Sequence, residues 1–278
     1  MDDDLFISRH ALADRLGRPD APFILDARRE VRFSPSEHRV AAAVRVLPSG
    51  DTARDVVVYC VYGHEVSQQA VRDLRAAGRR AWVLEGGIEG GEPGVDAADF
   101  VARVRAEALP LVRQRRDLGV SGEAPSQWIT RERPRIDRIA CPWLVRRFID
   151  PRAVFHFAPT AEVLARARAM GAVAFDIPGA PITHVGERCS FDALIDAFAL
   201  RLPALDRLAT IARGADTDRL DLDPACAGLL ATSLGLARLH DGDDHALLAA
   251  GLVVYDALYA WCVAEEHHGN EAHHWRPV

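Results

Sequence analysis

Cysteine is scarce in this sequence, and the few cysteines are not arranged in pairs. There are five, an odd number, at positions 60, 141, 189, 226 and 262, with no Cys-x-x-Cys motif. In a chain without a secretory signal, this pattern is typical of reduced thiols. We therefore expect no disulfide framework, and we expect the protein to be cytoplasmic.

Three further features are missing. The chain begins Met-Asp-Asp-Asp, the opposite of the cationic start of a signal peptide. No apolar run approaches the roughly 18 residues of a membrane span, so no membrane contact is expected. The formal net charge is −6 rather than positive. DNA is therefore not an expected partner, because nucleic-acid binding usually needs a basic surface.

The composition is that of a soluble globular protein, with 49% hydrophobic and 27% charged residues. A length of 278 residues is sufficient for two domains with separate cores. We predict domains at residues 1–108 and 127–278. The segment 109–126, which ends in a stretch containing glycine, serine and proline, is the predicted linker.

The first domain alternates short apolar runs with helical stretches, which predicts an α/β fold with a parallel sheet flanked by helices. The predicted strands are 23–26, 43–47, 56–59 and 81–84, and the predicted helices are 8–16, 67–78 and an arginine-rich stretch at 96–118. The second domain is predicted to be a mainly helical α+β domain. Its helices are expected near 137–149, 160–170, 190–200, 203–213, 223–236 and 243–265, with short strands near 153–157, 172–177 and 181–185.

Cys60 ends one of the predicted strands and opens a short loop before a helix. The backbone N–H groups of such a loop and the helix N-terminus favour an anion at the loop's centre, such as a thiolate. Gly63 lets the loop close because glycine adopts positive φ without a steric penalty. These features predict a nucleophilic Cys60, with His64 available for proton transfer. The alternatives are a cysteine that only packs and a histidine that only faces solvent.

Three short motifs occur in a fixed order: Asp26-Ala-Arg28, Cys60-x-x-Gly63 and Leu84-Glu-Gly-Gly-Ile88. With them, residues 5–92 resemble the rhodanese superfamily. The resemblance implies an α/β domain without a cofactor, in which Cys60 carries a persulfide from a small-molecule sulfur donor to a thiol acceptor. Arg28 joins Cys60, Gly63 and His64 as a candidate catalytic residue, with an ion pair to Asp26 or Glu85 as its alternative role. Many rhodaneses have a basic residue where this loop has His64 and Glu65, which leaves the donor open.

The segment 131–147 contains six arginines, at positions 131, 133, 135, 138, 146 and 147. Clustered guanidinium groups suit an oxyanion because they form paired hydrogen bonds with it. We predict Arg133, Arg138 and Arg146 as oxyanion-binding residues. A solvated, salt-bridged helix is the alternative.

A second stretch has metal-ligand chemistry. The predicted strand at 181–185 delivers His184, and Glu187 and Cys189 follow a turn at Gly186. This spacing suits a divalent metal such as Fe, Mn or Zn. We predict His184, Glu187 and Asp137 as ligands. The alternative is that Glu187 binds nearby backbone N–H groups and Cys189 packs in the core.

Two aspartates are expected to have other roles. Asp216 follows Arg213-Gly-Ala and is interpreted as a capping residue at a helix end. Asp256 lies in a strongly apolar predicted helix, where it needs a partner such as Arg213 or a metal.

Four motifs in the carboxyl-terminal half, at residues 133–148, 184–191, 213–216 and 255–261, resemble the C-terminal domain of the chromate resistance protein ChrB family. The resemblance covers residues 127–277 and implies a role in chromate resistance, either in sensing the oxyanion or in limiting its damage. It extends into a histidine-rich tail, where we predict His274 as a further metal ligand. The basic DNA-binding region of ChrB-type regulators is replaced here by the rhodanese-like segment, which argues against a transcriptional role.

Together these features predict a Cys60 sulfurtransferase coupled to a metal- or oxyanion-binding domain associated with chromate resistance. Two alternatives stay open. One is a non-enzymatic sensor of chromate or another oxyanion, and the other is a metalloenzyme that acts in oxidative stress.

Overall fold

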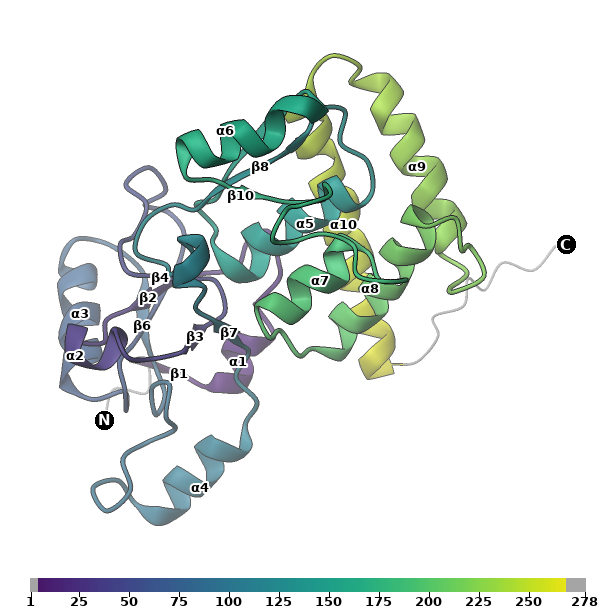
Figure 1. The fold of residues 1–278 in the computed structure, drawn as a ribbon. Helices are drawn as coiled ribbons and strands as arrows, with labels where there is room; N and C mark the ends of the chain where they lie inside the picture. The colour runs from purple at the N-terminus through teal and green to yellow at the C-terminus, as the bar shows by residue number, and fades with distance from the viewer. Residues whose placement is uncertain (1–4, 269–278) are drawn as a thin grey trace, which may run out of the picture.

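The computed structural model describes residues 5–268, apart from the side chains of Glu265, His267 and His268 (Figure 1). Its amino-terminal part is built on a five-stranded sheet in the order β1-β6-β5-β2-β4. All neighbouring strands in this sheet are parallel. The strands are β1 (Phe6–Ile7), β2 (Phe23–Asp26), β4 (Ala43–Val44), β5 (Val56–Tyr59) and β6 (Ala81–Leu84).

Both faces of this sheet are buried, as the continuous apolar runs predict. On the central strand β5, Val56 and Val58 pack in one apolar cluster with Val71 of α3. Val57 and Tyr59 point to the opposite face and join the main core. The helices of this part are α1 (Arg9–Ala13), α2 (Glu30–Phe33), α3 (Glu65–Ala76) and α4 (Ala98–Ala106). The predicted parallel sheet with flanking helices is thus confirmed.

The predicted linker is folded. Within it, β7 (Leu111–Arg113) pairs antiparallel with β3 (His38–Val40), and a short turn of 3-10 helix, η1, spans Arg116–Leu118. Val112 and Val120 are fully buried in the main core. The predicted helix at 96–118 accordingly ends with α4, because the chain after it forms a strand.

The carboxyl-terminal part is mainly helical, as predicted, around a three-stranded parallel sheet of order β10-β8-β9. The strands are β8 (Gln127–Arg131), β9 (Val154–Ala158) and β10 (Val173–Ala174). The helices are α5 (Asp137–Leu144), α6 (Val163–Met170), α7 (Ser190–Ala197), α8 (Pro203–Asp216), α9 (Cys226–Leu239) and α10 (Asp244–His268). A π-helical segment, η2 (Val145–Ile149), continues α5, and a 3-10 turn, η3 (Thr160–Glu162), precedes α6. The predicted strand at 181–185 is reduced to isolated bridges at Ile182 and Val185.

Helix α10 corrects the expectation that no apolar run reaches the length of a membrane span. Its segment Asp244–Ala264 has a mean hydropathy of 1.8, and within the described residues it alone meets that criterion by length and composition. Central helices of globular domains meet the same criterion. This one packs against α5, α8 and α9, with Leu252, Tyr255 and Cys262 buried.

The two parts share one apolar core. Leu12 lies in α1 and Leu16 just after it. Both belong to the same buried cluster as Phe148 and Tyr259 of the carboxyl-terminal part. Gly17 lies at this contact with φ +77°, and an added Cβ would overlap the rings of Phe148 and Tyr259. The absence of a side chain at Gly17 therefore allows the first segment of the chain to approach α10 closely.

Gly17→Ala is expected to destabilise the protein more than Gly78→Ala. Both glycines have nearly the same positive φ, but an added Cβ at Gly78 meets nothing within 4 Å. We expect the backbone strain common to both to cost about 1 kcal/mol. Overpacking should add about 1–3 kcal/mol at Gly17 only. Urea unfolding followed by tryptophan fluorescence measures the difference, and equal losses would contradict the packing of Gly17 on the two rings.

Candidate metal centre

His184 is surrounded by three aspartates from three different parts of the carboxyl-terminal domain. Its Nε2 atom lies 3.4 Å from Asp137 Oδ2, 3.4 Å from Asp176 Oδ1 and 3.2 Å from Asp216 Oδ2. For Asp137, His184 and Asp216, one potential ligand atom from each residue lies within 4.8 Å of the others. The geometry thus gathers one imidazole and several carboxylates around a single point.

Ends of regular elements bring these side chains together. Asp137 is the first residue of α5, Asp216 is the last residue of α8, and Asp176 follows β10. Ile136, just before Asp137, has φ 39° and ψ −95°. For a β-branched residue such a conformation costs about 1–3 kcal/mol, and strain of this kind concentrates at functional sites.

The Asp137 carboxylate is fully buried and only half satisfied. Its Oδ2 atom accepts a hydrogen bond from the backbone N–H of Ser190 at 2.5 Å and faces His184. Its Oδ1 atom is buried without a hydrogen-bond partner among the described residues. An unpaired buried carboxylate oxygen is costly. A bound cation would remove that cost.

Burial and mutual repulsion control the protonation of the cluster. The pKa of Asp216 is raised to about 7 by burial and by the nearby charges of Asp137 and Asp176. Burial also raises the pKa of Asp137, although His184 opposes this shift. The hydrogen bond to Asp137 raises the pKa of His184 to about 9, with further help from the other carboxylates. The imidazolium of His184 is therefore a positive partner shared by Asp137 and Asp216.

Asp176 is the best-supported acid of the cluster. It accepts hydrogen bonds from Arg131 at 2.9 Å and from the Ser190 hydroxyl at 2.8 Å. Arg138 lies 3.3 Å from it. Because these groups already neutralise Asp176, we regard it as a neighbour of the centre rather than a primary ligand.

Two buried thiols lie among these groups. Burial and the charge of Asp137 raise the pKa of both Cys141 and Cys189. The Cys189 thiol donates to Asp192 Oδ2 at 3.3 Å. In the metal-free protein, therefore, both thiols are held in their protonated form at neutral pH.

The structure brings together only part of the predicted metal site. His184 and Asp137 are adjacent, but the side chain of Glu187 is 86% exposed and pairs with Arg219 at 2.9 Å. Asp216 occupies the place we expected for Glu187, so its interpretation as a simple cap is corrected. His274 lies outside the described residues.

The three predicted oxyanion-binding arginines do not converge. The exposed Arg133 donates its backbone N–H to Asp244, and Arg138 lies beside Asp176. The guanidinium of Arg146 stacks over the ring of Phe155 at 5.1 Å.

Asp256 is likewise paired differently from our expectation. Its carboxylate accepts hydrogen bonds from Arg147 and from the Trp143 indole, at 2.7 and 2.8 Å. Arg213, the partner expected from the sequence, instead binds Asp192 at 2.7 Å. Asp256 is therefore satisfied without a metal.

The Cys60 loop forms a separate candidate site at the carboxyl end of the central strand β5. Cys60 is buried, and its Sγ lies 3.2 Å from the hydroxyl of Ser67 in α3. Gly63 packs against the turn at Gly86 and Gly87. A cavity of about 290 Å³ adjoins the loop, with Val61 and Tyr62 among its lining residues.

The other predicted catalytic residues in this half are held by acids. The Arg28 guanidinium forms a buried ion pair with Asp26, 2.6 Å apart, and Asp26 also accepts from the Tyr59 hydroxyl. His64 lies 3.0 Å from Asp96 through Nε2 and 3.4 Å from Glu92 through Nδ1. Arg28 is thus held at the carboxyl end of β2, where it also lines the cavity, and His64 is held by Asp96 and Glu92.

The comparisons concern mainly the carboxyl-terminal part. Residues 128–262 match the family model described as ChrB, C-terminal domain. The chain is 35% identical over 151 residues to Protein ChrB of Cupriavidus metallidurans, an alignment that covers 51% of this chain and 45% of that protein. The chain thus spans less than half the length of this curated relative. No solved structure matches the chain.

The cluster around His184 lies entirely within the matched segment, and Cys60 lies outside it. The cluster therefore lies in the part of the chain that is similar to the ChrB C-terminal domain. The resemblance of residues 5–92 to rhodaneses has no counterpart in this match.

The metal-free protein is expected to lose stability as the pH rises through the pKa values of the cluster. Because the folded state raises the pKa of Asp216 to about 7, its favourable contribution is complete below about pH 4 and is lost as the pH rises through 7. The contribution of His184 is complete below about pH 6.5 and is lost as the pH rises through 9.

Asp216→Asn removes the first of these two titrations. Relative to this variant, the wild-type protein should lose about 2–4 kcal/mol of unfolding free energy between pH 4 and pH 8. Urea unfolding in EDTA at both pH values measures this loss. Identical pH dependence in the two proteins would refute the raised pKa of Asp216.

Proposed function

We propose that residues 128–262 bind a divalent metal ion through Asp137, His184 and Asp216, and that this centre serves a role in chromate resistance. The observation that carries the proposal is the convergence of these side chains around a buried Asp137 oxygen that lacks a partner. The relationship of this segment to ChrB supports the connection with chromate.

The donor set suits particular ions. Carboxylate oxygens with a single imidazole nitrogen favour Mn²⁺ or Fe²⁺, and Zn²⁺ also accepts such ligands. The contacts that hold the ligands are already formed: the Ser190 N–H fixes Asp137, and Arg131 and Arg138 fix Asp176 beside them. Supporting contacts of this kind orient ligands in metal sites.

Several observations favour a metal-binding centre over direct capture of an oxyanion by arginines. The arginines nearest the cluster, Arg131 and Arg138, are engaged with Asp176, and Arg146 stacks on Phe155. The cluster itself is rich in carboxylates, which repel anions. A chromate sensor would therefore act through the metal rather than through a basic pocket.

Metal binding is expected to depend on Asp216 and His184 but not on Glu187. Titration calorimetry with Mn²⁺ and Zn²⁺ should show a single divalent ion per wild-type chain. Asp216→Asn and His184→Ala should weaken the affinity by about 10–100-fold or more, because each removes a ligand.

Glu187→Gln is the matched control, because this exposed carboxylate is close in sequence but pairs with Arg219. It should bind metal like the wild type. Asp216→Asn should also be more stable than the wild type in EDTA above pH 7, which separates loss of a ligand from misfolding. Unchanged metal affinity in Asp216→Asn, or its loss in Glu187→Gln, would refute the assignment.

A second candidate function is sulfur transfer at Cys60, favoured by the position of this thiol at the end of β5, beside Ser67 and next to the start of α3. In this reaction the Cys60 thiolate attacks the sulfane sulfur of a donor such as thiosulfate. The donor's S–S bond breaks, sulfite leaves, and a persulfide forms on Cys60. A second thiol then takes the outer sulfur and regenerates Cys60.

Cys60→Ser is expected to abolish sulfurtransferase activity with thiosulfate or mercaptopyruvate, because a hydroxyl cannot carry the sulfane sulfur. Cys262→Ser is the control, since Cys262 is also buried but lies in α10, far from the loop in sequence. With thiosulfate as donor and cyanide as the assay acceptor, release of thiocyanate measures the activity; with mercaptopyruvate as donor and a thiol as acceptor, release of pyruvate does. Equal activity in wild type and Cys60→Ser would exclude this function.

A further inference from the structure

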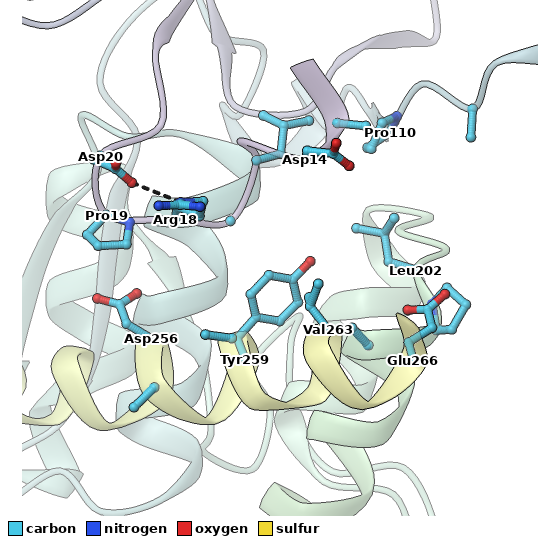
Figure 2. A pocket seen from close by; sticks show the side chains of 18 of the residues that line it. Asp14, Arg18, Pro19, Asp20, Pro110, Leu202, Asp256, Tyr259, Val263 and Glu266 are labelled. Carbon is cyan, nitrogen blue, oxygen red and sulfur yellow. Dashed lines mark hydrogen bonds and ion pairs between the residues drawn. The ribbon is translucent and has the colours of Figure 1, made fainter. Parts of the chain in front are cut away.

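A cavity of about 910 Å³ lies between the amino-terminal segment and α10, apart from both candidate sites. Figure 2 shows α10 along one side of the cavity and the segment around Arg18 and Pro19 along the other, with Tyr259 and Val263 between them. None of the residues around His184 or Cys60 lines it. Its volume lies within the range of small-molecule sites rather than of macromolecular interfaces.

Most of the lining is apolar. Leu16, Pro110, Leu202, Val253, Ala260 and Val263 contribute to it. Only 39% of the apolar segment of α10 is buried, and Val253 is 66% exposed. The helix thus presents an apolar face to this space in addition to the face that it buries in the core.

The polar groups of the cavity are predominantly acidic. Four carboxylates line it, from Asp14, Asp20, Asp256 and Glu266, against the single guanidinium of Arg18. Asp256 is neutralised by Arg147, and Asp20 by Arg18. Asp14 has only a 3.5 Å contact with the exposed His10.

Glu266 has no ion-pair partner among the side chains that the structure describes. In Figure 2, Asp14, Glu266 and the Tyr259 hydroxyl lie around the same open space. The cavity therefore combines an apolar wall with negative charge at Asp14 and Glu266, for which the described side chains supply only the weak contact of His10 with Asp14.

We propose that this cavity binds a small amphipathic cation, with an apolar or aromatic body along α10 and its positive charge near Asp14 and Glu266. The negative charges of Asp14 and Glu266 favour a cation. The apolar wall disfavours a small hydrated ion, because it offers no groups that could replace the water bound to such an ion. This proposal is independent of the metal centre.

A matched pair of probes tests the charge selectivity. Tetraphenylphosphonium and tetraphenylborate have nearly the same size and shape but opposite charge. In calorimetric titrations of the full chain in EDTA, the cation should bind at least about tenfold more tightly than the anion. Equal binding of both ions, or no binding of the cation, would overturn the proposal.

Variants of α10 test the location. Ala260→Trp should occupy part of the cavity along α10 and weaken binding of the cation by about tenfold or more. Ala249→Trp is the control, because Ala249 is equally an exposed alanine of α10 but does not line the cavity. Binding that survives in Ala260→Trp would place the ligand elsewhere. A dimer of the wild type that Ala260→Trp dissociates would show that a second copy of the chain, not a small cation, covers this face.

Asp14→Asn combined with Glu266→Gln tests the charged groups. This double variant should lose most of the preference for the phosphonium over the borate. Asp73→Asn, on the exposed face of α3, is the control and should keep the preference. A preference that persists in the double variant would contradict the assigned place of the positive charge.

Discussion

The arrangement of the carboxylate cluster around His184 depends on the burial of the Asp137 carboxylate. Through Oδ2, this side chain joins the start of α5 to the start of α7 at Ser190 and to the loop of His184. Burial raises the pKa of Asp216 at the end of α8, and a hydrogen bond from the backbone N–H of Asp137 offsets this rise only in part. A charged group in this position must be compensated, because its desolvation is costly. Arg131 and Arg138 compensate Asp176, so the imidazole of His184 is left to face Asp137 and Asp216. A metal cation would correct this remaining imbalance.

The spacing of the arginines in the same region indicates an oxyanion site, but in the structure several of these arginines form ion pairs with aspartates. Arg131 and Arg138 hold Asp176, Arg213 holds Asp192 and Arg147 holds Asp256. Each guanidinium thus compensates an acid that fixes one element to another, and these pairs form a frame around the cluster. Because the positive charges are already engaged, the open chemistry at the centre is that of carboxylates. This arrangement of charges is the reason for proposing a cation rather than an anion as the ligand of the centre.

Three features could be predicted from the sequence: the parallel sheet, the mainly helical second half and the proximity of Asp137 to His184. Each of them rests on a local pattern or on a short sequence motif. Asp176 and Asp216 could not be identified in this way, since they reach His184 only through the ends of β10 and α8. Glu187 was a natural choice three residues from His184, but the turn closed by the bridge between Val185 and Arg188 leaves it in solvent. The segment at 109–126 has the composition of a linker but is folded, because the three residues of β7 are enough to pair with β3. Closeness in sequence is thus a weak guide wherever a turn or a helix end intervenes.

Helix α10 connects features that the sequence keeps apart. Tyr255 donates to the carbonyl of Ile136, next to Asp137, and Tyr259, one turn later, packs against the ring of Phe148 at the contact with Gly17. Asp256 lies between these two tyrosines and holds Trp143 and Arg147 of the α5 segment. Tyr255 of α10 therefore supports the backbone beside the carboxylate cluster, and Tyr259, one turn later, lines the large cavity. Because packed interiors transmit small shifts rather than absorb them, a ligand that moves α10 in the cavity would also act on the backbone that presents Asp137.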